Sequence, residues 1–490
     1  MGNSDQKPWL FNLRSSETFL VLTVSIAIFT DSFIYGVIVP IIPVALVERV
    51  GARPEDAQYL VSILLAVYGG TLLAGSPLFG YFADKCSSRK LPFVLGLIAL
   101  GTSTALFAFA RTFPILVIAR SLQGFSAAAV WVVGLAIVSD NVPPERVGAA
   151  LGMTTIGLTW GFLLGPMVSG YIHDTFGYYG CYAIPVGLIV VDVVLRFAMI
   201  EMPKANLRKS EPVPEVHTDS DSAYEDNIYD TFNSNDVRSQ GRFSRRERER
   251  EDAPLLGPSS QSVQHPAKDD EQHATILSLL RTPRLPLSLL ATTSMAITLS
   301  ALETSLPLFT METFAWTPKG AGLIFLALTV PSFAGVQLGK LIDSMGVRIL
   351  GVISFAACCC AWILMRLVTE NSPGHIALLV VLLLILGLTI VTIEIISMME
   401  VSQVITDYEA EFPGAFGEKS PIAQAYALFN MSFAAGQLVG PIMAGPIRVN
   451  GGWGTMTLVL GLLAGVTAIP FGLFSGSPRK TVETESTDAV

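Results

Sequence analysis

Charged side chains are scarce in this chain. Asp, Glu, Lys and Arg make up 14% of its 490 residues, whereas soluble domains carry about 25%. This deficit excludes an ordinary soluble domain. The formal net charge is −9, which argues against a nucleic-acid partner because nucleic acids are themselves anionic.

Cysteine is also scarce, at five residues. Three of them, Cys358, Cys359 and Cys360, stand together inside an apolar run, and no Cys/His spacing of a metal site occurs. No nucleophile–base spacing of a hydrolase or transferase stands out either. We therefore expect no disulfide framework, no metal site and no enzymatic activity.

Long apolar runs are abundant instead. Each is near the roughly 20 residues with which an α-helix crosses a bilayer, whereas barrel strands are about ten residues long and alternate in polarity. The sequence therefore predicts an all-α membrane protein in a lipid bilayer. Its twelve transmembrane helices are expected at residues 18–40, 58–80, 91–110, 113–138, 146–170, 178–200, 285–309, 320–342, 349–369, 376–402, 421–446 and 453–474.

A polar stretch divides these runs into six and six. The loop with Lys85, Arg89 and Lys90 and the Arg-rich polar stretch lie on the same side as both termini, so the positive-inside rule places that side in the cytosol. The predicted regions are a cytosolic tail (1–17), an N-terminal six-helix half (18–200), a disordered cytosolic linker (201–284), a C-terminal six-helix half (285–474) and a second cytosolic tail (475–490).

The linker is rich in Ser, Asp, Glu, Arg and Pro, a composition that cannot bury enough apolar surface to fold. It contains Glu251, Leu255 and Leu256 in the spacing of an acidic dileucine signal, which a sorting adaptor binds. An inert solvated linker is the alternative interpretation.

Two short patterns occur twice, and the copies lie 259 and 275 residues apart. Such internal repetition in an apolar chain predicts two related halves with a binding site between them. The first pattern places an acid and an Arg at the cytosolic end of a helix, where they can form a cytosolic gate that opens as the halves move. Its members are Gly80, Asp84, Arg89, Gly339, Asp343 and Arg348.

The second pattern combines Gly at four-residue spacing with a Pro inside a span. Gly at this spacing permits close helix packing, and Pro removes a backbone hydrogen bond and bends the helix. Equivalent bends in both halves predict a role in gating or in sealing against leak. The members of this helix-bend motif are Gly161, Gly165, Pro166, Gly436, Gly440 and Pro441.

Four of the ionisable residues inside the predicted spans are candidates for function, because a charge is costly there. Asp31 and Glu303 lie in the first span of each half, and Glu394 lies in the tenth span. A buried carboxyl can hold a proton or face a cationic substrate. Arg120, in the fourth span, stays charged and can pair with a carboxylate that has lost its proton. We expect these four residues to couple protons to substrate.

The chain resembles the major facilitator superfamily. The resemblance rests on the pattern from Gly80 to Lys90, on its copy from Gly339 to Arg348, on Arg120-Ser-Leu-Gln123-Gly124, and on Gly161-x-x-x-Gly165-Pro166, which is similar to a motif of proton-driven exporters. It implies two pseudo-symmetric six-helix bundles in the major facilitator fold, a monomer, and a proton gradient in place of a cofactor.

A narrower resemblance connects the chain with the drug:proton antiporter group, specifically the vesicular amine transporters and their fungal relatives. It rests on Asp31-Ser-Phe with Val39-Pro40-Ile-Ile-Pro43 and on Leu302-Glu303-x-x-Leu306-Pro307. Asn430 stands where these relatives carry an acid. We take four residues near the motifs as candidates for lining the substrate cavity, namely Tyr35, Gln123, Trp160 and Asn430.

The predicted function is proton-coupled antiport that exports a small organic molecule, a drug-like compound or secondary metabolite, from the cytosol by alternating access. Two alternatives remain at this point: a vacuolar or vesicular amine loader, and a transporter-like membrane sensor. The multi-pass protein is expected in the plasma membrane or the vacuolar membrane.

Overall fold

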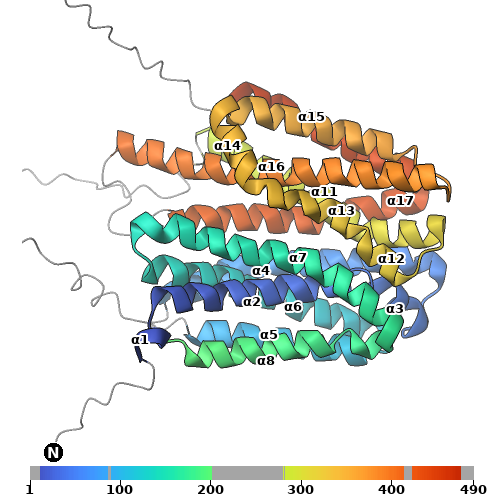
Figure 1. Cartoon of the computed structure of the whole chain (residues 1–490), viewed down its shortest axis with the longest axis horizontal. Coiled ribbons are helices and arrows are strands. Elements are labelled where there is room, and N and C mark those ends of the chain that lie inside the picture. The colour runs from blue at the N-terminus through green and yellow to red at the C-terminus, as the bar shows by residue number, and fades with distance from the viewer. Residues whose placement is uncertain (1–10, 86–89, 201–279, 281, 413–421, 476–490) are drawn as a thin grey trace, which may run out of the picture. The chain divides into compact units, whose positions relative to one another are not determined.

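The computed structural model describes residues 11–85, 90–200, 280, 282–412 and 422–475. The regular elements of these residues are helices (Figure 1). Those of the first half are α1 (Phe11–Arg14), α2 (Glu17–Ile38), α3 (Ile42–Glu48), the 3-10 turn η1 (Pro54–Asp56), α4 (Ala57–Lys85), α5 (Lys90–Phe109), α6 (Phe113–Asn141), α7 (Pro144–Gly180) and α8 (Ala183–Ala198).

The second half repeats this succession of long helices. Its elements are α11 (Arg284–Phe314), α12 (Pro318–Leu323), α13 (Phe325–Thr329), the 3-10 turn η2 (Val330–Ala334), α14 (Gly335–Met345), α15 (Val347–Met365), α16 (Pro373–Glu411) and α17 (Ile422–Phe474).

Nine helices of the described residues are long and apolar enough to cross a membrane. This number differs from twelve for three local reasons. One is length, because α8 has only 16 residues. Another is a join, because α17 carries the last two predicted spans with a non-helical residue, Gly452, between them. The all-helical membrane fold is confirmed, and the count of twelve crossings stays a prediction.

The third reason is a break within the run predicted at residues 320–342. The structure divides this run into α12, α13, η2 and α14. Pro331 lies in η2, and a proline removes one backbone hydrogen bond and clashes with the preceding turn. The interruption therefore follows from a residue that the sequence already shows.

Side-chain caps and glycines set several of the helix ends. The Ser16 hydroxyl accepts a hydrogen bond from the Phe19 amide at 3.2 Å and so begins α2. Gly346 separates α14 from α15 with a φ of 86°, a left-handed value that favours glycine. Gly177 and Gly452 break α7 and α17 in the same way.

The Gly-Pro helices pack against the first long helix of their own half. In the first half, a Cβ added at Gly161 would lie 2.8 Å from the Phe29 carbonyl oxygen on α2, and one added at Gly165 would lie 2.6 Å from the Phe33 carbonyl oxygen. Phe29 and Phe33 are one turn apart, as the two glycines are, so the helices touch backbone to backbone along one stripe.

The second half repeats this stripe between α17 and α11. A Cβ added at Gly436 would lie 2.6 Å from the Thr293 carbonyl oxygen, and one added at Gly440 would lie 2.8 Å from the Ile297 carbonyl oxygen. The repeated pattern thus makes the same helix contact twice. Both helices continue through Pro166 and Pro441, so the predicted bend at these prolines stays a prediction.

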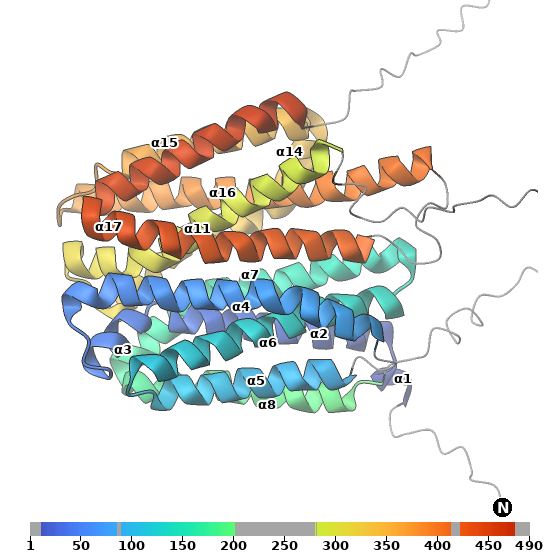
Figure 2. The same cartoon turned by 180° about the vertical axis from the view of Figure 1, so that it is seen from behind.

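The contacts between the halves gather toward one end of the helices. We call the end that carries α3 and α12 the distal end, and the end that carries α1 the terminal end (Figures 1 and 2). At the distal end, a Cβ added at Gly445 would lie 1.9 Å from the Ser62 hydroxyl, and one at Gly170 would lie 2.7 Å from the Pro318 carbonyl oxygen. Helices α7 and α12 therefore meet backbone to backbone, and α17 packs its Gly445 backbone directly on the Ser62 side chain of α4.

Polar groups reinforce this distal seal. Gln58 on α4 donates a hydrogen bond of 3.2 Å to the Thr304 carbonyl oxygen on α11. The Gln58 side-chain oxygen accepts from Arg448 on α17, and Arg448 also forms an ion pair of 2.8 Å with Glu312. Because Arg448 is almost fully buried, these bonds satisfy a charge that would otherwise be costly. They tie both halves together at one point.

Candidate functional site

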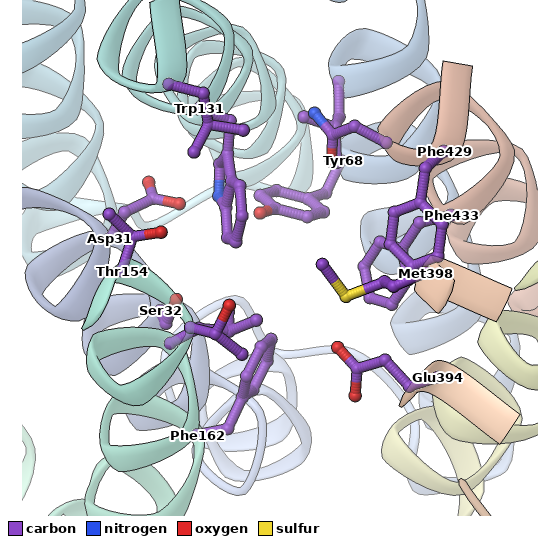
Figure 3. Close-up of a pocket in the computed structure, with 15 residues that line it drawn as sticks. Asp31, Ser32, Tyr68, Trp131, Thr154, Phe162, Glu394, Met398, Phe429 and Phe433 are labelled. Atoms are coloured by element: carbon purple, nitrogen blue, oxygen red, sulfur yellow. The ribbon is translucent and has the colours of Figure 1, made fainter. Parts of the chain in front are cut away.

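A cavity lies between the halves, with a volume of about 820 Å³ counting its open mouth. Figure 3 shows Asp31 and Glu394 on opposite sides of the cavity, with aromatic side chains and Met398 between them. The lining residues are Asp31, Ser32, Tyr68, Leu72, Trp131, Leu135, Thr154, Thr155, Leu158, Phe162, Glu394, Met398, Phe429, Asn430 and Phe433.

A second cavity adjoins the first. The two share Leu158, Phe162, Glu394 and Phe433, so these residues stand at the border between them. Glu303 lines the second cavity only. The three carboxyls predicted from the sequence therefore border one continuous inter-half region, and Glu394 faces both parts of it.

The charge of this lining has one sign. The residues that line the two cavities include the three carboxyls and contain no Lys, Arg or His. Asp31 and Glu303 are 2% and 4% exposed, and Glu394 is half-buried. A carboxylate removed from water needs a cation or a proton as compensation. The cavity therefore favours cations and protons over anions.

Glu303 on α11 is held by side chains from other helices. The Tyr35 hydroxyl of α2 donates a hydrogen bond of 2.6 Å to Glu303 Oε2, and Gln437 of α17 lies 3.2 Å from the same hydroxyl. All three side chains are buried. Because Tyr35 belongs to the first half and Glu303 to the second, this bond joins the halves at the centre of the spans.

Arg120 on α6 lies behind Tyr35 in an aromatic box. The guanidinium carbon is 5.2 Å from the ring centroid of Tyr35, 5.7 Å from that of Tyr68 and 5.3 Å from that of Phe107. Its Nη1 donates a hydrogen bond of 2.7 Å to Gln123 Oε1. Aromatic faces attract cations, so the box holds the charge. Within the described residues, Arg120 Nε and Nη2 have no hydrogen-bond partner.

Asp31 has a different environment from Glu303. Its Oδ1 atom is buried and finds no hydrogen-bond partner in the described part of the chain. The indole nitrogen of Trp131 faces the carboxylate (Figure 3). Asp192 on α8, also buried, is close enough for its charge to act on Asp31. Two acids thus reinforce the negative potential at this side of the cavity.

The four residues predicted to line the substrate cavity lie in different places. Asn430 lines the first cavity, and its Nδ2 atom is without a partner among the described residues. Tyr35 and Gln123 line neither cavity, because they are bound to Glu303 and Arg120. Trp160 is not among the residues that line the two cavities, and it contacts Phe333 of the second half, with ring centroids 5.4 Å apart. Its helical position directs it away from Phe162, only two residues later.

Several residues that line the cavity were not predicted from the sequence. Tyr68, Met398, Phe429 and Phe433 carry no charge and belong to no repeated pattern. An aromatic residue in a span can face lipid, a helix or a cavity, and its type does not tell these apart. Gln437, next to the repeated Gly436, was the closest available signal for the Glu303 partner.

The predicted cytosolic gate is only partly within the described residues. The side chains of Asp84, Arg89 and Asp343 lie outside them. Among the described residues, a Cβ added at Gly80 would meet only Val132 at 3.9 Å, and one at Gly339 would meet nothing within 4 Å, so no described helix approaches these glycines closely.

Arg348 bonds to the end of α17. Its Nε atom donates to the Gly472 carbonyl oxygen, and its Nη2 atom donates to the Leu473 carbonyl oxygen at 3.3 Å. A positive side chain is favourable at a helix C-terminus, where carbonyl groups lack intrahelical partners. The gate role of Arg348 stays a prediction.

Two further expectations concern sorting and metal binding. Glu251, Leu255 and Leu256 of the predicted sorting signal lie outside the described residues. In the part of the chain that is described, no group of three or more His, Cys, Asp or Glu is arranged to hold a metal ion.

Sequence comparison places this geometry in context. The family model for the Major Facilitator Superfamily matches residues 24–412. The "Uncharacterized MFS-type transporter C18.02" of Schizosaccharomyces pombe is 31% identical over 451 residues, which covers 92% of this chain and 94% of that protein. The "Probable vesicular acetylcholine transporter-B" of Danio rerio is 30% identical over 198 residues, 40% of each chain.

A solved structure shares the fold. The human organic anion transporter MFSD10 (TETRAN) superimposes with a TM-score of 0.60 over 93% of this chain and 99% of its own, at 15% sequence identity. At this low sequence identity, the structural likeness supports the arrangement of helices and says nothing about the transported molecule.

Proposed function

This chain belongs to the major facilitator superfamily, and we propose that it is a proton-coupled antiporter that exports a small organic molecule from the cytosol by alternating access. The cargo would be a drug-like compound or a secondary metabolite. One observation carries this proposal: three carboxyls and, among the described residues, no basic side chain line the two adjoining cavities between the halves.

A carboxyl in this position suits antiport because its proton and a cationic group compete for the same oxygen atoms. Release of a proton prepares the site for cargo, and return of a proton expels the cargo. Asp31 and Glu394 face the first cavity and would bind cargo or protons there. Glu303 would carry the proton that controls the contact between the halves.

Arg120 would couple this proton to conformation through Tyr35. A deprotonated Glu303 attracts the Tyr35 hydroxyl and the positive charge behind it, which strengthens the bond between α11 and α2. A protonated Glu303 is a weaker acceptor, because hydrogen bonds to charged groups are about twice as strong as neutral ones. Protonation would therefore loosen the central contact and permit the halves to move.

Alternating access requires a second state with the distal seal broken. In that state the gate residues Gly80, Asp84 and Arg89, and their copies in the second half, would latch the terminal end. We place the terminal end in the cytosol, in the plasma or vacuolar membrane, with the protein as a monomer. The linker residues Glu251, Leu255 and Leu256 would bind a sorting adaptor.

The test uses purified protein in sealed vesicles with the pH indicator pyranine inside and an imposed pH gradient. A panel of organic cations, anions and neutral compounds is added outside. We expect a subset of cations to drive proton movement with the native protein, and Asp31→Asn to abolish it. Cargo movement that ignores both the gradient and the substitution would refute proton coupling.

A vacuolar or vesicular amine loader is the second candidate function. The acid-only cavity and the partial similarity to a vesicular acetylcholine transporter favour it. Localisation distinguishes the two. A loader accumulates cargo inside an acidic compartment, and an exporter of the cell surface depletes the cell of it. The sensor alternative gains no support from the comparisons.

A further inference from the structure

Two of the cavity carboxyls keep oxygen atoms that no described residue binds, although Trp131 forms a hydrogen bond with the Asp31 carboxylate. The Asp31 Oδ1 atom has no hydrogen-bond partner among the described residues. Glu394 makes no hydrogen bond or ion pair with them either. Glu303 differs because Tyr35 already binds it. Asp31 and Glu394 are therefore the two acids that remain available to a ligand.

These two acids belong to different halves and face each other across one cavity. Asp31 lies on α2 and Glu394 on α16 (Figure 3). Most of the remaining lining side chains are apolar or aromatic, Phe162, Met398 and Phe433 among them, and the polar ones are Ser32, Thr154, Thr155 and Asn430. Aromatic faces attract cations, and the apolar surface favours a hydrocarbon or ring. No positive side chain of the lining neutralises either acid.

We propose that this cavity binds molecules with two cationic groups, one at each end of an apolar or aromatic spacer, and that Asp31 holds one group while Glu394 holds the other. The proposal rests on the transport function proposed above and narrows its cargo. A molecule with a single cation compensates one acid and leaves the other to a proton. A dication compensates both and connects the halves directly.

The experiment measures binding of permanently charged probes to the purified full-length protein in nanodiscs by titration calorimetry. The probes are bis(trimethylammonium) alkanes of increasing chain length and the matching alkyltrimethylammonium ions. Quaternary groups cannot exchange protons, so their charge is fixed. At one optimal length, we expect the dication to bind about tenfold or more tightly than the monocation, as a second charged contact would give.

Removal of either acid should erase this advantage. In Asp31→Asn and in Glu394→Gln, the dication should bind no more tightly than the monocation does to the same variant. Glu411→Gln, an exposed acid near the end of the same helix as Glu394, is the matched control and should leave both affinities unchanged. A dication that binds no better than the monocation at every length would overturn the proposal, as would equal losses for both probes.

Charge-conserving variants guard against misfolding. Asp31→Glu lengthens one acid by a methylene, so the optimal spacer should shorten, and Glu394→Asp should lengthen it. An optimal length that does not respond to either variant would also overturn the proposal. These assays need no pH gradient. A failure of proton coupling would leave the binding result intact, and the reverse also holds.

Discussion

Asp31 and Glu303 occupy the first long helix of their respective halves, yet their environments are opposite. Glu303 accepts a hydrogen bond from Tyr35 of the other half, with Arg120 beyond it. Asp31 keeps one buried oxygen without a partner among the described residues and faces the cavity. The repeated fold supplies two equivalent positions for an acid, and the neighbouring side chains give the acids different tasks.

This difference indicates how a symmetric framework performs an asymmetric exchange. When an acid is hydrogen-bonded to the other half, as Glu303 is, a change in its protonation changes the strength of the contact between the halves. An acid without a partner can give its charge to a ligand. The following experiments compare the two sites, beginning with the largest expected effect.

The first prediction concerns removal of each acid. Asp31→Asn should abolish pH-driven exchange and should erase the affinity advantage of the dication over the monocation. Glu303→Gln should lower exchange about 100-fold, near 3 kcal/mol for a lost charged partner, and change probe affinity by no more than about twofold. Calorimetry and the pyranine assay give the two values separately. If Glu303→Gln weakened binding as much as Asp31→Asn, the division of tasks would be wrong.

The second prediction removes only the Tyr35 hydroxyl. Tyr35→Phe keeps the ring beside Arg120 and deletes the donor to Glu303. We expect about a tenfold slower pH-driven exchange, because a hydrogen bond to a charged group contributes about 1.5–3 kcal/mol. Tyr59→Phe, on an exposed face of α4, is the control and should leave the rate unaltered. Equal exchange rates in Tyr35→Phe and the native protein would show that the Tyr35 hydroxyl does not take part in proton coupling.

The third prediction concerns the distal seal. Arg448→Ala deletes the bond to Gln58 and leaves Glu312 without its partner, so the distal-open state should gain population by about fivefold, near 1 kcal/mol. Spin labels at Arg53 and Glu370, both exposed, would report the distance between the halves there. Arg366→Ala, also exposed, serves as the control. An unchanged distance distribution would count against Arg448 as part of the seal.

The smallest effect is expected at Trp160. This side chain contacts Phe333 and lines neither cavity, so Trp160→Phe should change probe affinity by less than about twofold. Phe162 lines both cavities, so Phe162→Ala should lower probe affinity clearly more, because it removes apolar contact area. Affinities measured side by side decide the matter. A larger loss at Trp160 than at Phe162 would place the cargo elsewhere.

The sequence identified the fold because its signals are long or repeated. Apolar runs near membrane length and the doubled Gly-Pro pattern survive errors of a few residues. The Gly161 and Gly436 stripes then appear in the structure as equivalent helix contacts. The acids Asp31, Glu303 and Glu394 were found for a related reason, because a carboxyl in a span is rare and costly.

Side-chain direction could not be predicted in the same way. Each residue turns a helix by about 100°, so an error of one or two positions moves a side chain from the cavity to a neighbouring helix. Tyr35 and Trp160 were taken as cavity candidates because they lie near the motifs, and both side chains make contacts between the halves. The partner of Tyr35 is 268 residues away, a pairing that no local pattern specifies.

The aromatic box around Arg120 has an electrical consequence. The box holds a permanent positive charge inside the spans, and the contacts described for the guanidinium are three rings and an amide rather than a carboxylate. A charge that crosses a full membrane potential of 100 mV changes the free energy by about 2.3 kcal/mol. Any movement of α6 along the membrane normal carries this charge through part of that field. Membrane voltage should therefore shift the equilibrium between the two states of alternating access, even when the exchange of proton for cargo moves no net charge.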